Sequence, residues 1–365
     1  MMGSSKLKVI ITSPSLNPQK NVSGISSVVH FIITQNQEVE YIHFEIGKKD
    51  NESSNIFQRI LRIFKCLIKW FFLLCRNRNV LVHYNIPLMH GALLRDFCFL
   101  FVVHALNIPI VLHIHGGIYM KNRQRPRHVR LIISRCLKWA KWVLVLSDEE
   151  KQIIEEDFVC MNLSVLPNCV DLTDASKYKK SIDSNAPLSI LYMGRIERNK
   201  GVDFILSATQ MLQTEGISFK LHVAGKEETD GEFLPKFSKE LGTNFVYHGV
   251  IFGRQKVEVI KSCDIFLLPS FYEGLPMSLI ETMSFGLVPI VTEVGGIPNL
   301  VKNGENGVYV EIKDTDSIVR QIKYLDINRD KLQILSTQAQ FTIFSKFDAS
   351  LYVNELNSCY KMICE

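Results

Sequence analysis

Short apolar segments alternate with longer amphipathic segments along most of the chain, and this pattern predicts an α/β protein. Strands are predicted at residues 8–11, 80–83, 110–113, 143–146, 189–193, 220–224, 245–247, 265–268 and 289–291. Helices are predicted at residues 56–74, 89–106, 127–140, 149–157, 202–212, 254–262, 276–285 and 316–325. Since the strands are continuously apolar and alternate with helices, we expect parallel sheets covered on both faces.

The chain is long for a single domain. Its 365 residues exceed the roughly 250–300 at which one hydrophobic core stops growing. Residues 171–187 are polar, show little periodicity and separate two sets of predicted strands. We therefore predict an N-terminal domain at 1–175 and a C-terminal domain at 186–346, with a final helix at 347–365.

The net charge of +5 conceals an asymmetry between the two halves. Residues 1–180 contain 24 Lys and Arg against 14 Asp and Glu, whereas residues 181–365 contain 18 against 23. The nine cysteines include no C-x-x-C pair, which favours reduced thiols in a cytosolic protein over disulfides or a zinc site. No stretch is apolar for long enough to predict a signal peptide or a membrane-spanning helix.

Residues 269–281 carry the strongest chemical signal, because they join a predicted strand to a predicted helix. They read Pro-Ser-Phe-Tyr-Glu-Gly-Leu-Pro-Met-Ser-Leu-Ile-Glu. Gly274 permits an unusual turn, and Pro276 suits the first position of a helix. The backbone N–H groups of Met277 and Ser278 would then lie unpaired at the positive end of the helix dipole, which suits a phosphate. The plain alternative is a strand–turn–helix with a capping glutamate.

Two further segments follow predicted strands, at the ends where open parallel sheets bind ligands. In Gly-Arg-Ile-Glu-Arg-Asn-Lys-Gly (194–201), Arg195 could offer a bidentate fork and Lys200 a point charge to a diphosphate. Taken alone, a solvated charged loop is the simpler interpretation. In Val-Gly-Gly-Ile-Pro (294–298), the paired glycines would let the backbone approach a ligand, although this is also ordinary turn chemistry.

Three candidate sites have simpler interpretations. Ser23-Gly24-Ile25 resembles a phosphate loop with one glycine, but a helix N-cap explains it equally well. His113 and His115 lie on one side of a predicted strand, without an evident third metal ligand. Asp314-Thr315-Asp316 is literally a metal-binding D-x-D motif, yet it precedes a predicted helix, where Asp or Thr is a good N-cap. We expect activity without a metal.

Together these motifs resemble the retaining glycosyltransferases of the GT-B fold, family 4 (glycosyl transferases group 1). The resemblance spans nearly the whole chain and is most specific over residues 189–307. It implies two Rossmann-like α/β domains whose parallel sheets face across a cleft, with the nucleotide-sugar held mainly by the C-terminal domain. It also implies that residues 347–365 cross back to complete the N-terminal acceptor domain.

The resemblance implies a role for each matching residue. Arg195 and Lys200 match cations on the donor diphosphate, Glu273 the residue near the donor sugar hydroxyls, and Glu281 the residue that binds the ribose hydroxyls. Gly24 matches the N-terminal loop beside the phosphates, and His115 the histidine that lines the donor sugar site. The expected catalytic set is Arg195, Lys200, Glu273 and His115, and the expected donor-binding set is Gly24, Gly274, Leu275, Met277, Ser278 and Glu281.

Two positions depart from the family pattern. Ser23 stands where a second glycine is common, and Asn299 stands where the Gly-Gly-Ile-Pro element commonly continues with glutamate. Both departures leave the loop details and the sugar preference open.

The basic half contains two stretches that suit an anionic membrane surface. Arg59, Arg62, Lys65 and Lys69 form one stripe of a predicted helix that is otherwise apolar and aromatic. Residues 121–142 hold eight Lys and Arg, no acid, and two tryptophans. Such stretches are typical of membrane-surface helices, although a solvated polar stripe is the plain alternative. No nucleic-acid recognition motif is present.

The sequence thus predicts a cytoplasmic, metal-independent hexosyltransferase, peripheral on the inner face of the membrane. Its donor would be a UDP- or GDP-sugar and its acceptor a lipid-linked glycan or oligosaccharide in surface polysaccharide or glycolipid synthesis. No separate cofactor is expected. Eight residues of helix span roughly 12 Å, which disfavours Glu273 and Glu281 as a glycosidase pair. A sugar-nucleotide epimerase of the same fold and a non-catalytic nucleotide-sugar-binding subunit remain alternatives.

Overall fold

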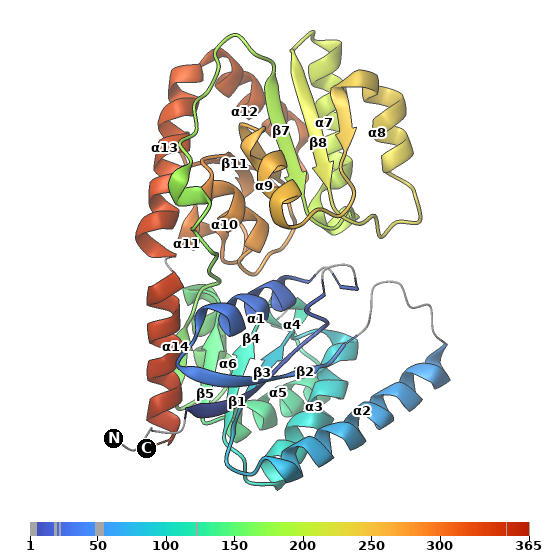
Figure 1. Ribbon diagram of the computed structural model, residues 1–365. Helices are drawn as coiled ribbons and strands as arrows, with labels where there is room; N and C mark the ends of the chain where they lie inside the picture. Colours follow the sequence, from blue (N-terminus) through green and yellow to red (C-terminus); the bar gives the residue numbers. More distant parts are fainter. Residues whose placement is uncertain are drawn as a thin grey trace. The chain divides into compact units, whose positions relative to one another are not determined.

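Each half of the chain folds around its own sheet of six parallel strands (Figure 1). The computed structural model describes residues 6–17, 20–21, 23–47, 55–121, 123–347 and 349–364. The chain divides into two compact units, the first formed by Met1–Cys169 with Ala349–Glu365 and the second by Val170–Asp348. The prediction of parallel sheets in an α/β fold is confirmed.

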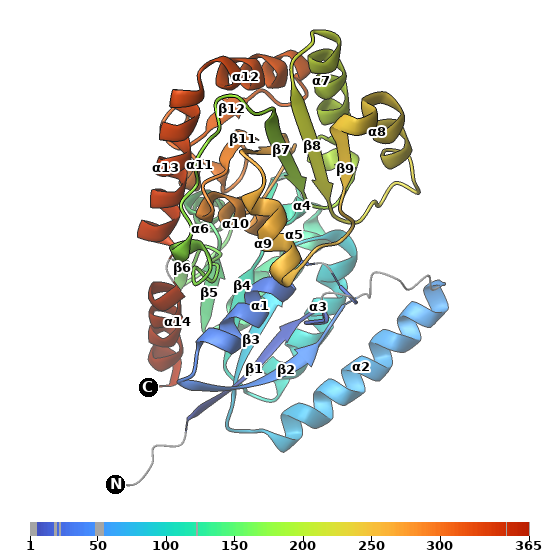
Figure 2. The same cartoon turned by 45° about the horizontal axis from the view of Figure 1, so that its top comes forward.

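The first unit has the strand order β2-β1-β3-β4-β5-β6. The strand β3 and its neighbour β4 are buried along their whole length, because helices cover both faces of the sheet. Helices α1 and α14 pack together, whereas α2, α3 and α5 form another packed row (Figure 2). The strands are β1 (Leu7–Ser13), β2 (Val39–Glu45), β3 (Leu81–Ile86), β4 (Ile110–Ile114), β5 (Trp142–Val145) and β6 (Leu163–Val165). The helices are α1 (Gly24–Gln35), α2 (Ile56–Arg76), α3 (His90–Ala105), α4 (Ile118–Lys121), α5 (Arg127–Trp139), α6 (Asp148–Asp157) and α14 (Ala349–Cys364).

The second unit has the strand order β12-β11-β10-β7-β8-β9. The chain moves outward in one direction from β7 and then returns to β10 on the other side, so the order reverses between β7 and β10. Ligands of open α/β sheets bind at the carboxyl ends of strands at such a reversal. The strands are β7 (Leu188–Met193), β8 (Phe219–Ala224), β9 (Phe245–Tyr247), β10 (Ile265–Leu268), β11 (Val288–Thr292) and β12 (Val308–Val310). The α-helices are α7 (Val202–Thr214), α8 (Leu234–Leu241), α9 (Gly253–Lys261), α10 (Met277–Ser284), α11 (Ile297–Leu300), α12 (Thr315–Ile327) and α13 (Arg329–Lys346), with short 3-10 turns at Ala175–Lys177, Arg198–Lys200 and Gly242–Asn244.

The predicted strands are all present, but β2, β6 and β12 were not predicted. β2 alternates apolar and polar residues and is only partly buried at the edge of its sheet, so it lacks the continuous apolar run of a central strand. β6 and β12 are edge strands of three residues each, too short to show a period.

Helix α14 is tied to the first sheet by polar contacts. The Asn36 Nδ2 donates to Asn357 Oδ1 (2.7 Å), and the Tyr360 hydroxyl lies 2.6 Å from His83 Nδ1 on β3. Tyr360 is fully buried. In the described ranges, no helix offers a long enough apolar stretch to cross a membrane.

Candidate functional site

Two of the predicted motifs meet at the strand reversal of the second sheet. The 194–201 segment leaves the carboxyl end of β7, and the 269–281 segment leaves that of β10, the adjacent strand. The Phe271 N–H donates to the Asn199 carbonyl (3.0 Å), which joins the two loops directly. Gly201 has φ +73°, and a Cβ there would lie 2.2 Å from the Pro269 carbonyl oxygen. Glycine at 201 is therefore required by both the backbone conformation and the close approach.

This junction brings Lys200 against Glu273. The Lys200 Nζ donates to Glu273 Oε1 (2.7 Å), and the Ser270 hydroxyl donates to the same oxygen (2.7 Å). Glu273 is only 8% exposed, so the lysine supplies the counter-charge that a buried carboxylate needs. No bond to Glu273 Oε2 is found among the described residues, which leaves that oxygen able to accept from a ligand.

The Gly-Gly-Ile-Pro segment packs against the backbone of the loop that carries this carboxylate. Gly295 has φ +55°, and a Cβ there would lie 1.7 Å from the Glu273 carbonyl oxygen. The Gly296 N–H donates to the Gly274 carbonyl (2.7 Å). The chain bends at Gly274 without positive φ there, whereas Gly295 adopts the left-handed conformation. The paired glycines thus pack against the Glu273–Gly274 backbone.

Arg195 lies exposed at the start of the same loop. The buried Tyr192 hydroxyl donates to the Arg195 carbonyl, which fixes the backbone there. Burial, together with the nearby Glu273 carboxylate, raises the pKa of Tyr192 well above its usual range, so this hydroxyl keeps its proton. No hydrogen bond or ion pair of the Arg195 guanidinium is found in the part of the chain that the structure describes.

Helix α10 begins at Met277, directly after Pro276 in an extended conformation. The first intrahelical bonds run from the Leu279 and Ile280 N–H groups to the Pro276 carbonyl. No backbone acceptor for the Met277 or Ser278 N–H is found among the described residues, as expected for the first turn of a helix. Leu275 is buried just before this turn.

Glu281 lies one turn into α10 and forms an ion pair that the sequence did not reveal. The Lys256 Nζ on α9 donates to Glu281 Oε1 (2.7 Å), and the two side chains are partly buried. Lys256 and Ser270 are the residues near the motifs that sequence reasoning missed. Ser270 lay inside a recognised motif, but Lys256 becomes a candidate only once α9 is known to pack beside α10.

The first unit carries the remaining two members of the predicted catalytic and donor-binding sets. Gly24 is the first residue of α1, and Ser23 occupies the N-cap position without a side-chain capping bond. His115 follows β4, and its Nε2 lies 2.6 Å from Asn85 Oδ1. His113 instead points to His83, with His113 Nδ1 3.2 Å from His83 Nε2.

The structure also bears on the D-x-D motif and on the cysteines. Asp314 accepts from the Ser317 N–H (3.1 Å) and is the N-cap of α12, as the capping interpretation of the D-x-D motif predicted. In the described ranges, no three His, Cys, Asp or Glu side chains are grouped to hold a metal. All nine cysteines are free.

The basic stripe lies on α2, whose N-terminal end extends away from the rest of the first unit (Figures 1 and 2). Among the residues of this helix whose burial is described, only Trp70 and Leu74 are fully buried. A stripe of apolar residues is exposed alongside the basic one. These exposed residues are Phe57, Ile60, Leu61, Phe64, Ile68, Phe71 and Phe72.

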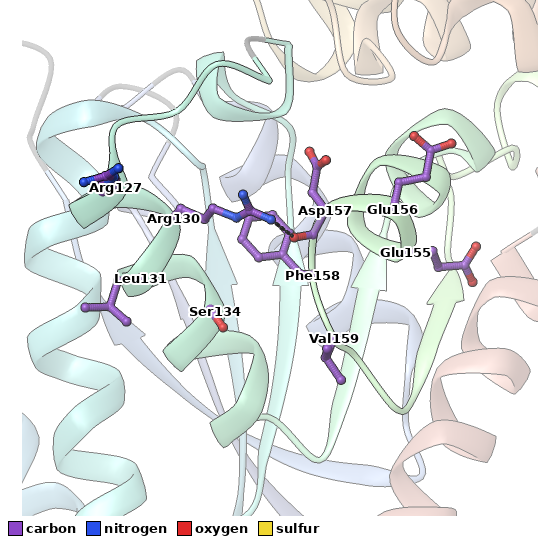
Figure 3. Close-up of a pocket in the computed structure, with 9 residues that line it drawn as sticks. All are labelled: Arg127, Arg130, Leu131, Ser134, Glu155, Glu156, Asp157, Phe158 and Val159. Atoms are coloured by element: carbon purple, nitrogen blue, oxygen red, sulfur yellow. Dashed lines mark hydrogen bonds between the residues drawn. The ribbon is translucent and has the colours of Figure 1, made fainter.

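A surface pocket of about 530 Å³ lies between α5 and the end of α6 (Figure 3). Its walls carry both charge signs, with Arg127 and Arg130 on one side and Glu155, Glu156 and Asp157 on the other. Asp157 is already paired with Arg123 and Arg125. None of the predicted site residues lines this pocket.

Two protein families match the chain, one over each half. The model of glycosyl transferases group 1 matches residues 174–341, and that of glycosyltransferase family 4 matches residues 29–174. The chain is 26% identical over 275 residues to the UDP-Gal:alpha-D-GlcNAc-diphosphoundecaprenol alpha-1,3-galactosyltransferase of Escherichia coli, covering 69% of each chain. It is 25% identical over 184 residues to the capsular polysaccharide biosynthesis glycosyltransferase CapM of Staphylococcus aureus, a match that spans 50% of this chain and about half (48%) of that relative.

Solved structures share the fold over nearly the whole chain. Sucrose-phosphate synthase from Thermosynechococcus elongatus has a TM-score of 0.78 at 15% identity and covers 98% of this chain and 99% of its own. HepE from Anabaena, solved in complex with UDP-glucose, has a TM-score of 0.73 at 13% identity and covers 98% and 100%. The two family models together span residues 29–341, and the chain belongs to the family 4 glycosyltransferases of the GT-B fold.

Proposed function

We propose that this glycosyltransferase moves a sugar, with retention, from a UDP- or GDP-sugar to a lipid-linked or oligosaccharide acceptor in surface polysaccharide or glycolipid synthesis. The observation that carries the proposal is the Lys200–Glu273 pair at the strand reversal of the second sheet, beside the first turn of α10. The acceptor class follows the similar E. coli enzyme, whose name specifies a diphosphoundecaprenol-linked sugar. The donor class is proposed by analogy with HepE, a protein of similar fold whose structure was solved in complex with UDP-glucose.

In the proposed mechanism, the cationic groups act on the departing nucleoside diphosphate. Its bond to the sugar breaks as negative charge grows on the diphosphate, and Arg195 and Lys200 offset that charge. The Met277 and Ser278 N–H groups at the start of α10 add fixed dipoles of the same sign. The leaving phosphate accepts the proton of the acceptor hydroxyl, so no protein nucleophile is required.

The two glutamates hold the rest of the donor. Glu273 Oε2 would accept from a sugar hydroxyl while Oε1 remains bonded to Lys200 and Ser270. Glu281 would accept from the ribose hydroxyls in the same manner, with Lys256 on its Oε1. Since Lys200 shares its charge with Glu273, Arg195 and the helix start supply the rest of the positive charge that a diphosphate needs.

The donor is expected to be identified by the stabilisation it confers. A ligand at about 100 times its dissociation constant stabilises the folded state by about 2.7 kcal/mol, so thermal unfolding with UDP-, GDP- and ADP-sugars should single out one nucleotide. Glu281→Ala should remove most of that stabilisation. Glu258→Ala, an exposed position on the neighbouring α9, should retain it. Equal stabilisation of wild type and Glu281→Ala would contradict the ribose assignment.

The exposed surface of α2 is proposed to contact an anionic membrane, where a lipid-linked acceptor would reside. Each basic residue near such a surface contributes about 1 kcal/mol, and the adjacent apolar stripe adds buried area. Replacing Arg59, Arg62, Lys65 and Lys69 by glutamate should abolish co-sedimentation with phosphatidylglycerol vesicles. Replacing Lys236 and Lys239 of α8 should not. Equal binding of wild type to neutral and anionic vesicles would exclude this role.

An epimerase or a non-catalytic subunit is less well supported. An epimerase needs acid and base groups beside the sugar, and the described part of the second-unit site offers two carboxylates that are both paired with lysine. A non-catalytic binding subunit would not need the two hydrogen bonds by which Lys200 and Ser270 hold Glu273 Oε1. Formation of an isomeric nucleotide-sugar without acceptor would instead identify an epimerase.

A further inference from the structure

Asn85 joins the carboxyl ends of three neighbouring strands in the first sheet. It lies on β3, between β1 and β4. Its backbone N–H donates to Thr12 Oγ1 on β1 (3.1 Å), its Nδ2 donates to the Thr12 carbonyl (2.8 Å), and its Oδ1 lies 2.6 Å from His115 Nε2. Asn85 is almost fully buried, so its side chain has little freedom to turn.

This geometry fixes which end of the amide faces His115. A backbone carbonyl can only accept a hydrogen bond, so the Asn85 atom beside the Thr12 carbonyl is the NH₂ group. The atom beside His115 is therefore Oδ1, which can also only accept. Nε2 of His115 must then carry the proton, and Nδ1 of a neutral imidazole carries a lone pair.

The surroundings keep this imidazole neutral. Burial lowers the pKa of His115 to about 3. Its ring centroid lies 4.1 Å from that of His113, which in turn contacts His83, and burial lowers the pKa of both. In the described residues, the hydrogen-bond partners of these three rings are Asn85, Tyr360 and one another, so no carboxylate favours the charged form.

We propose that Asn85 is a positioning residue that fixes the Nε2–H tautomer of His115, so that Nδ1 can accept a hydrogen bond only from a proton-donating group of the donor sugar. The inference rests on the proposed function together with the donor-sugar role that the family resemblance implies for His115. His115 is partly exposed, and no partner for its Nδ1 is found among the described residues. A sugar hydroxyl can donate a hydrogen bond to Nδ1, whereas a carboxylate has no proton to donate and its lone pairs would repel the lone pair of Nδ1. The enzyme should therefore prefer neutral, hydroxyl-bearing sugars to uronic acids.

The tautomer is measurable without any substrate. In ¹⁵N-labelled wild type, the His115 ring resonances should show protonated Nε2 and unprotonated Nδ1 from pH 5 to pH 9. Thr12→Val, which keeps the backbone carbonyl, should give the same tautomer. A wild-type Nδ1–H tautomer, or an imidazolium at pH 6, would overturn the proposal whether or not the protein transfers sugar.

The isosteric Asn85→Asp variant tests the consequence for the reaction. A carboxylate facing Nε2 raises the pKa of His115, and the charged ring can no longer accept at Nδ1. Turnover should then fall about tenfold for each pH unit below the new pKa, whereas wild type should show no such limb. Discrimination against a UDP-uronic acid should shrink in the variant at low pH. If the wild type turns over normally and a folded Asn85→Asp variant has the same pH profile, the positioning role is refuted but the transfer function stands.

Discussion

Removing both loop cations, in Arg195→Ala with Lys200→Ala, is expected to lower turnover by at least about a thousandfold. Loss of one preorganised group that stabilises developing charge costs about 10²–10³ in kcat, and both of these groups would act on the leaving diphosphate. The measurement is release of nucleoside diphosphate in the presence of acceptor. Turnover within tenfold of wild type would exclude these residues from diphosphate stabilisation.

The same loop supplies a matched control for this double variant. Arg198 lies between the two cations in sequence but is 59% exposed and pairs with Glu232. Arg198→Ala should retain near-normal turnover. Lys200→Ala leaves the Glu273 carboxylate buried without its counter-charge, so its stability is compared with that of Lys200→Ala with Glu273→Gln, which should fold normally. Because Glu273 is itself assigned to the donor sugar, the free energy of unfolding and not turnover is the informative readout of this pair.

Gly201→Ala is expected to destabilise the second unit by about 3 kcal/mol, compared with about 1 kcal/mol for Gly216→Ala. Both glycines have φ +73°, so alanine meets the same left-handed backbone cost of roughly 1–2 kcal/mol at each. At Gly216 a Cβ would have no neighbour within 4 Å, whereas at Gly201 it would lie 2.2 Å from the Pro269 carbonyl oxygen. Overpacking of this kind adds about 1–3 kcal/mol.

Urea denaturation of the two variants separates backbone strain from the steric clash. Gly201→Ala should also lose most of its turnover, because the loops that carry Lys200 and Glu273 would be forced apart. Gly216→Ala should stay active. Equal destabilisation of the two variants would show that the contact between the loops is not the reason for glycine at 201.

The central strands were predictable from the sequence for a physical reason. A buried parallel strand is continuously apolar, and the loops that follow such strands are where ligands of open sheets bind. The roles of Arg195, Lys200, Glu273 and Glu281 came from the family resemblance and stay predictions. The pairing of Lys200 with Glu273 was not predicted, because the two residues are 73 positions apart and meet only when β7 and β10 are adjacent.

Other features depend on packing that no local pattern contains. The apolar residues of α2 were recognisable, but whether they face the core or solvent depends on how far the helix extends beyond its sheet. Asn85 lay two residues beyond the predicted strand 80–83 with no motif around it, and its importance emerges only from its bonds to Thr12 and His115. The left-handed turn beside Glu273 is at Gly295, whose contact with the Glu273 carbonyl depends on packing between two loops.

The central claim is that the chain transfers a sugar from a nucleotide-sugar to a separate acceptor. It is tested most directly by measuring nucleoside diphosphate release from the stabilising donor, with and without a diphosphoundecaprenol-linked sugar, in the presence of a chelator. We predict release that depends on acceptor and equals the amount of glycosylated lipid formed. No release with any UDP- or GDP-sugar, or release that yields only free sugar regardless of acceptor, would contradict this account.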